Sequence, residues 1–122
     1  DLAQPAALGD DARIAISVGR SEAVALPYTL DLLERHPLGS QAFVPMAATA
    51  MLVMVALDSG GIPGTPLAFL THKGQGVQYH PGAWHGVLAP LSGPADFLIV
   101  DRIGAGVNLE EYPLPEPILI TE

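Results

Sequence analysis

The sequence has no cysteine and only five basic residues. Without cysteine, disulfides, thiolate nucleophiles and sulfur metal ligands are all excluded, so a transition metal would have to bind His, Asp, Glu or Gln. Thirteen acidic residues give a net charge of −8, which repels nucleic acids and anionic membranes. No apolar run approaches the roughly 20 residues that cross a bilayer, and Asp1 to Asp11 lacks a signal-peptide pattern. We therefore expect a cytoplasmic protein with no nucleic-acid or membrane partner.

The chain has 122 residues, 49% of them hydrophobic, so we expect residues 1–122 to form a single domain. Its 13 glycines and 12 prolines recur along the whole chain, which favours many short strands. Arg13 to Val18 alternates, and Ile14, Ile16 and Val18 are predicted to form the apolar face of a half-buried strand. Other predicted strands are Leu26 to Arg35, one from Gln41 or Ala42, Met51 to Leu57, Leu67 to Thr71, Phe97 to Val100 and Ile118 to Ile120. The pattern predicts an all-β sandwich or barrel.

Three of the four histidines lie in two short segments that are rich in turn residues. The first reads ERHPLGSQAFVPM and begins at Glu34. Pro37 biases His36 to an extended conformation, in which Glu34 and His36 point to the same face. The sequence therefore predicts a carboxylate and an imidazole side by side at this point.

The second segment reads GQGVQYHPGAWH and begins at Gly74. Its Pro81 and Gly82 suit a type II turn, which would gather the neighbouring side chains at one hairpin end. These side chains are Tyr79, His80, Trp84 and His85. If both segments lie at one end of a barrel, His36, His80 and His85 converge there, although a lone histidine is usually structural or exposed. Tyr79 and Trp84 fit the roles of core aromatics and of a stacking surface equally well.

A family resemblance rests on RHPLGSQAFVPM, GQGVQYHPGAWH, and DFLIVDR with the downstream NLEEY. These motifs resemble the ureidoglycolate lyase family of allantoin and purine catabolism, in order from about Leu26 to Tyr112. The resemblance implies a cupin-like jelly-roll β-barrel and a carbon–nitrogen lyase that splits (S)-ureidoglycolate into glyoxylate and urea. Family members usually carry a further N-terminal segment, which we expect this chain to lack. Because cupins commonly pair, the implied protein partner is a second copy in a homodimer.

Four residues resemble the second cupin motif, whose histidine is a ligand in metal-dependent cupins: Gly76, Pro81, Gly82 and His85. In place of the two histidines and glutamate of the first motif, the chain offers Glu34, His36 and Gln41. The resemblance thus implies a metal set of Glu34, His36, Gln41 and His85, holding nickel or another divalent ion. The alternative is a metal-free site in which the same residues form hydrogen bonds.

The implied reaction removes a proton from the substrate hydroxyl and delivers one to the departing ureido nitrogen. Imidazole can do either at neutral pH. Our hypothesis assigns His36 and His85 to the metal or the substrate oxygens, and His80 or Tyr79 to proton transfer.

Four other residues are predicted to bind substrate. Ser40 and Gln41 would hydrogen-bond the ureido group, Trp84 would stack on the ligand, and Arg102 would clamp the carboxylate. For Arg102, a structural pairing with Asp101 fits equally well. Two other functions stay open: a non-catalytic cupin that binds a glyoxylate-like acid, and a cupin isomerase or dioxygenase, which the altered first motif disfavours.

Overall fold

The computed structural model describes residues 3–122, and every regular element in this range is a β-strand. None of these residues forms a helix long and apolar enough to cross a membrane. In chain order the strands are β1 (Arg13–Ser21), β2 (Tyr28–Arg35), β3 (Gln41–Pro45), β4 (Leu52–Ala56), β5 (Asp58–Ser59), β6 (Ile62–Pro63), β7 (Leu67–Leu70), β8 (Val77–Tyr79), β9 (Trp84–His85), β10 (Ala95–Ile103) and β11 (Glu110–Ile120). Each strand predicted from the sequence is therefore confirmed.

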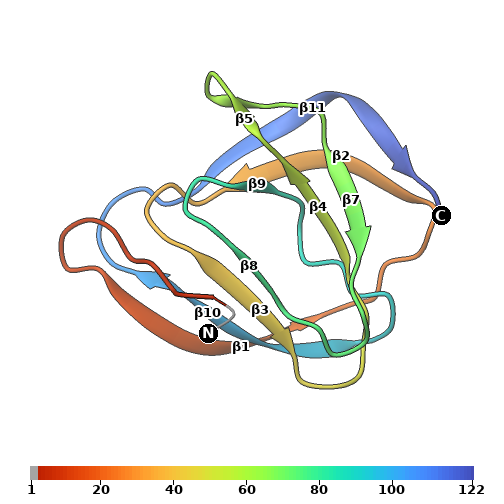
Figure 1. Ribbon diagram of the computed structural model, residues 1–122, viewed down its shortest axis with the longest axis horizontal. Helices are drawn as coiled ribbons and strands as arrows, with labels where there is room; N and C mark the ends of the chain where they lie inside the picture. Colours follow the sequence, from red (N-terminus) through yellow and green to blue (C-terminus); the bar gives the residue numbers. More distant parts are fainter. Residues whose placement is uncertain (1–2) are drawn as a thin grey trace.

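The strands form two antiparallel sheets that face each other across a barrel-like interior (Figure 1). One sheet has the order β1-β10-β3-β8 and the other β11-β2-β9-β4-β7, while β5 and β6 make a separate small hairpin. Most successive strands cross from one sheet to the other, so the neighbours in each sheet come from distant parts of the chain. The single-domain cupin-like β fold is as expected. This topology makes β2 and β9, which carry or adjoin candidate histidines, direct neighbours.

Buried apolar side chains form two clusters, one on each face of β4. Leu52 and Met54 belong to the first cluster, which lies within the curve of the five-stranded sheet. Val53 belongs to the second, where it joins Phe97 of β10 and so fills the space between the two sheets. Because successive residues of a strand point to opposite faces, one short apolar strand supplies both clusters.

Strand β1 is present as predicted, but the prediction of which face is buried was wrong. Ile16 and Val18 are 70% and 60% exposed and lie on the outer surface. The inward positions are the small residues Ala15 and Gly19, and a Cβ added at Gly19 would lie 2.8 Å from Ile99 Cδ1. The space beneath β1 therefore accepts only small side chains, and its branched residues are left outside.

Candidate functional site

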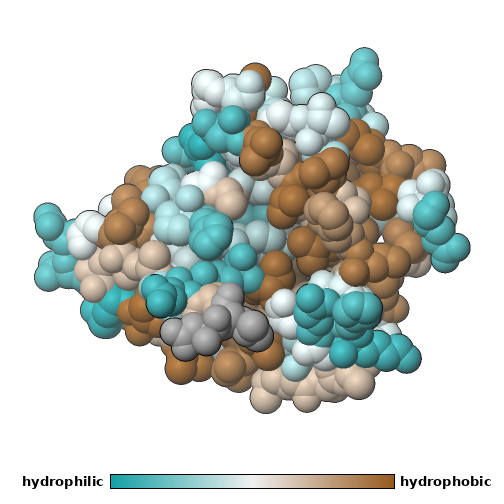
Figure 2. Space-filling model, viewed as in Figure 1, coloured by the Kyte–Doolittle hydropathy of each residue, from teal (hydrophilic) through white to brown (hydrophobic). Residues whose placement is uncertain are grey.

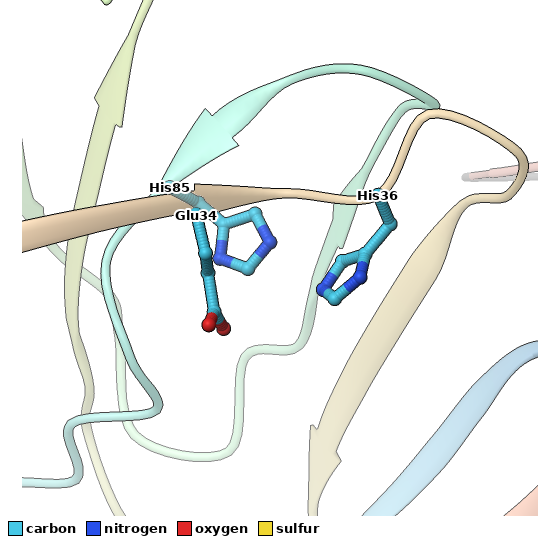
Figure 3. A group of neighbouring side chains, drawn as sticks. All are labelled: Glu34, His36 and His85. Atoms are coloured by element: carbon cyan, nitrogen blue, oxygen red, sulfur yellow. The ribbon is translucent and has the colours of Figure 1, made fainter. Parts of the chain in front are cut away.

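One end of the barrel interior brings together Glu34, His36 and His85 (Figure 3). Glu34 on β2 lies directly opposite His85 on β9, and His36 follows the end of β2. One ligand atom from each of the three side chains lies within 4.8 Å of the others. The two sequence-distant histidine segments thus meet in space, as the convergence hypothesis requires.

Both imidazoles are held through Nδ1. His36 Nδ1 lies 2.8 Å from the carbonyl oxygen of Asn108, and His85 Nδ1 lies 2.9 Å from that of Gly86. A carbonyl can only accept, so each Nδ1 carries the hydrogen and each Nε2 of the neutral ring keeps a free lone pair. Both Nε2 atoms are buried without a hydrogen-bond partner. A buried polar atom that forms no hydrogen bond costs about 1–3 kcal/mol, so a ligand that binds these two lone pairs would recover that free energy.

Burial sets the ionisation of the site. It lowers the pKa of His85 to about 4, and the nearby His36 adds to this shift. The hydrogen bond to Gly86 opposes the shift. Burial also raises the pKa of Glu34, although His36 opposes this shift. Burial raises the pKa of Tyr79 to about 12. At neutral pH the His85 imidazole is therefore uncharged and Tyr79 keeps its phenolic hydrogen.

Tyr79, the last residue of β8, stacks on the His85 ring with a centroid distance of 4.2 Å and an interplanar angle of 9°. Residues 80–83 then form the predicted type II turn, closed by a 3.1 Å backbone hydrogen bond, with Gly82 at φ 78°. The Gly82 N–H donates to the carbonyl of His36 at 2.9 Å. The turn thus ties the two histidine segments together.

Gln41 joins the same end of the barrel from β3. It lies opposite Tyr79 on one side and opposite Asp101 of β10 on the other, and its Nε2 donates to Asp101 Oδ2 at 3.3 Å. Asp101 was missed as a site residue, since the sequence suggested only a pairing with the following arginine. The alternation of β10 was a usable signal, because Phe97 and Ile99 pack between the sheets and Asp101 shares their face.

Asn108 was also missed. Besides its contact with His36, its side-chain oxygen accepts a 2.7 Å hydrogen bond from the Leu38 N–H. Asn108 therefore holds the segment after β2 at two points, which fixes the tautomer and the position of the His36 ring. Only its place in the NLEEY motif hinted at this role.

The structure does not bring Arg102 to the cluster. Its Nε donates to the Leu8 carbonyl at 2.7 Å and its Nη2 to the Ala105 carbonyl at 2.6 Å. Because Asp101 faces inward, the next residue of β10 points to the other face, where it fastens the N-terminal segment to the sheet. The predicted carboxylate clamp is therefore turned away from the histidines.

Trp84 is likewise separated from the cluster. It is 2% exposed in the first apolar cluster, and its Nε1 donates to Asp58 Oδ1 at 3.0 Å. The Arg35 guanidinium lies 4.5 Å from the centroid of its ring. Since Trp84 precedes the inward-facing His85 on β9, its ring lies on the opposite face of the sheet and serves packing.

Ser40 and His80 also face away from the cluster, for the same reason of alternation. Ser40 is buried, and its Oγ accepts a 2.7 Å hydrogen bond from the Ala6 N–H, whereas the following Gln41 faces the interior. His80 is exposed, whereas the preceding Tyr79 faces His85. Of the predicted site residues, the structure thus gathers Glu34, His36, Gln41, Tyr79 and His85.

Comparison with known proteins assigns the family. A family model described as ureidoglycolate lyase matches residues 1–121. The chain belongs to the ureidoglycolate lyase family. It is 52% identical over 117 residues to the ureidoglycolate lyase of Chelativorans sp. (strain BNC1), which covers 96% of this chain and 71% of the relative. The family predicted from the motifs is thereby confirmed.

Two further ureidoglycolate lyases are similar over most of the chain. The protein of Rhodobacter capsulatus is 53% identical over 110 residues, which cover 90% of this chain and 68% of the relative. That of Agrobacterium fabrum is 46% identical over 121 residues, which cover 99% and 73%. The matched regions include every residue range that forms the candidate site.

In this member of the ureidoglycolate lyase family, Glu34, His36 and His85 suit a divalent ion. Two imidazoles and one carboxylate are ligands that nickel, zinc and similar ions accept. The two unpartnered Nε2 atoms are the lone pairs that such an ion would use, and the Nδ1 hydrogen bonds orient both rings as is usual for histidine ligands. The residues present therefore fit a metal.

Proposed function

We propose that this chain is a ureidoglycolate lyase that splits ureidoglycolate into glyoxylate and urea. Relatives named for this activity are about half identical to it over most of its length. The observation that carries the proposal is the pair of buried, unpartnered Nε2 atoms of His36 and His85 beside Glu34. The cytoplasm as its compartment stays a prediction of the sequence.

We further propose that Glu34, His36 and His85 hold a divalent ion, with nickel as the first candidate. The charged side chains at this end of the barrel include Glu34 and Asp101, whose negative charge repels an anionic substrate. When bound, the ion would supply positive charge for the substrate carboxylate and lower the pKa of the substrate hydroxyl. The ion would thus bind the substrate carboxylate in place of Arg102, which is turned away from the site.

Side chains of the protein then transfer the two protons of the reaction, one from the substrate hydroxyl and one to the departing nitrogen. The substrate O–H and C–N bonds break while a C=O π bond and an N–H bond form, so no oxidant or reductant is needed. A carboxylate has two oxygens, so Glu34 would hold the ion through one of them and accept the hydroxyl proton through the other. Tyr79, with a pKa of about 12, keeps its proton at neutral pH and donates it to the departing nitrogen. In a metal-free form, the second candidate, Nε2 of His36 is the acceptor instead.

The test is urea release from ureidoglycolate, followed against the spontaneous rate. We expect the purified protein to accelerate release by many orders of magnitude, as enzymes typically do. A non-catalytic binding protein would leave the rate unchanged or slow it by protecting the substrate. Either of those results would contradict the proposed function.

The outer face of the four-stranded sheet supports a homodimer. Ile16 and Val18 of β1 lie opposite Val100 and Leu98 of β10, so exposed and half-buried aliphatic side chains form one continuous surface. Monomeric proteins rarely expose large apolar patches. We therefore propose that two copies pair through this face.

Introducing two acidic residues at this face should separate the two copies of the dimer. We expect the double variant Ile16→Glu, Val18→Glu to run as a monomer in analytical ultracentrifugation, because a charge buried in an apolar interface is costly. The matched control is Phe69→Glu on β7, which lies in another exposed apolar area, over the right of Figure 2, and should leave the dimer intact. A dimer broken by the β7 change instead would place the interface there.

A further inference from the structure

Asp101 is a carboxylate of the barrel interior with an unusual single partner. Within residues 3–122, it forms no ion pair, although Arg102 is its neighbour in sequence. The Arg102 guanidinium is engaged by two backbone carbonyls on the other face of β10. The side-chain hydrogen bond of Asp101 is instead with Gln41, whose Nε2 lies 3.3 Å from Asp101 Oδ2.

This bond determines how the Gln41 amide is turned. An ionised carboxylate only accepts hydrogen bonds, whereas an amide has one atom that donates and one that accepts. With Asp101 on one side, Gln41 must present Nε2 to it, and Oε1 is left as the free atom of the amide. The strand order β10-β3-β8 places Gln41 between Asp101 and Tyr79, whose ring stacks on His85. The free oxygen therefore belongs to the end of the barrel that holds the histidines.

A ureido group is recognised by its N–H donors. Glyoxylate and simple hydroxy acids lack these donors, so an acceptor of fixed direction separates a ureido acid from them. A glutamine that could turn freely would present its Nε2–H donor half of the time. That donor would then face the N–H donor of the ureido group, and no hydrogen bond would form. Fixing the amide thus converts an ambiguous side chain into a selective one.

We propose that Asp101 is a positioning residue that turns Gln41 Oε1 toward the ureido N–H groups of the substrate. The proposal rests on the proposed lyase function and adds the means by which the ureido part is selected. Asp101 does not touch the substrate in this arrangement, and it favours ureido binding only through Gln41. Its negative charge acts in the opposite direction, because it repels the anionic substrate.

A double-mutant cycle tests this dependence. Asp101→Asn keeps the shape but lets the Gln41 amide turn either way, and Gln41→Met removes the amide. We expect Gln41→Met to raise KM for ureidoglycolate about tenfold, as for loss of one hydrogen bond. Asp101→Asn should raise KM about twofold, because half of the Gln41 amides then present the wrong atom. In both variants kcat should change by less than about twofold. The double variant should be no worse than Gln41→Met alone, because no amide is left for Asp101 to orient and the loss of its negative charge does not weaken the binding of an anion.

Asp96→Asn is the matched control, since Asp96 lies on the same strand but pairs with the exposed Arg20. It should leave KM and kcat unchanged. The positioning role would be overturned if the KM increases of the two single variants multiplied in the double variant, or if kcat fell with KM unchanged. In either case, urea release by the wild-type protein would still support the lyase function. Loss of metal affinity in Asp101→Asn would also overturn it, by assigning Gln41 Oε1 to the ion. A wild-type protein that releases no urea overturns both proposals together. If Gln41→Met does not fold, as judged by its melting curve, the KM and kcat of Asp101→Asn decide alone.

Discussion

Replacing His85 by alanine will lower kcat for urea release by about a thousandfold or more. The imidazole is buried, its Nδ1 is tied to the Gly86 carbonyl, and its Nε2 faces Glu34 and His36 without a partner. Alanine removes that lone pair from the metal or the substrate. It also removes the ring on which Tyr79 stacks, so the proposed proton donor loses its support. Steady-state kinetics, corrected for spontaneous decay of the substrate, measures the effect.

The matched control is His80→Ala. His80 belongs to the same histidine segment but is exposed and outside the cluster, so its loss should leave kcat and KM within about twofold. His85→Gln serves as a second variant that fills the cavity, and circular dichroism establishes that each variant is folded. Near-normal turnover in folded His85→Ala, or a large loss in His80→Ala, would contradict the assignment.

The second large effect concerns the ion. Replacing Glu34 by glutamine should weaken divalent-ion binding about a hundredfold, because the amide lacks the negative charge that attracts the ion. Urea release should fall further than ion binding, because glutamine cannot accept the hydroxyl proton. Chelation of the wild-type protein should abolish urea release, and added Ni²⁺ should restore it. Elemental analysis and calorimetric titration measure the binding without relying on activity.

The register of β11 with β2 supplies a matched control. Glu111 lies opposite Glu34 but is exposed at the surface, so Glu111→Gln should bind the ion as the wild type does. Full urea release after complete chelation would refute the metal proposal and favour the form in which Nε2 of His36 accepts the hydroxyl proton. Equal losses in Glu34→Gln and Glu111→Gln would point to a general effect of acidic charge.

The strands and the histidine pair were predictable because their signals are local. Glycine and proline residues between apolar runs marked the strands, including β2. Extended geometry around Pro37 placed Glu34 and His36 on one face, and Pro81 with Gly82 indicated the turn that now ties the two segments together. Each of these inferences needs only neighbouring residues and the period of a strand.

The direction of each side chain was not predictable in the same way. A strand's alternation separates its two faces without saying which one is interior. Ile16 was expected on the buried face and is outside, while Trp84 and Arg102 point away from the site that their neighbours His85 and Asp101 enter. Neighbouring residues of a strand point to opposite faces. If the strand were shifted by one residue, a side chain of the site would be replaced by one that only packs or binds the backbone.

From the sequence alone follow the all-β class, the family, the absence of thiol chemistry and the two histidine segments, since composition, motifs and turn residues are properties of the chain itself. Only the tertiary structure decided that Glu34, His36 and His85 share one buried site, that Gln41 is bound by Asp101, and that Ser40, His80, Trp84 and Arg102 lie elsewhere. The physical reason is the pairing of distant strands: which residues meet, and on which face, depends on sheet order and register, and these are settled by packing the whole chain at once.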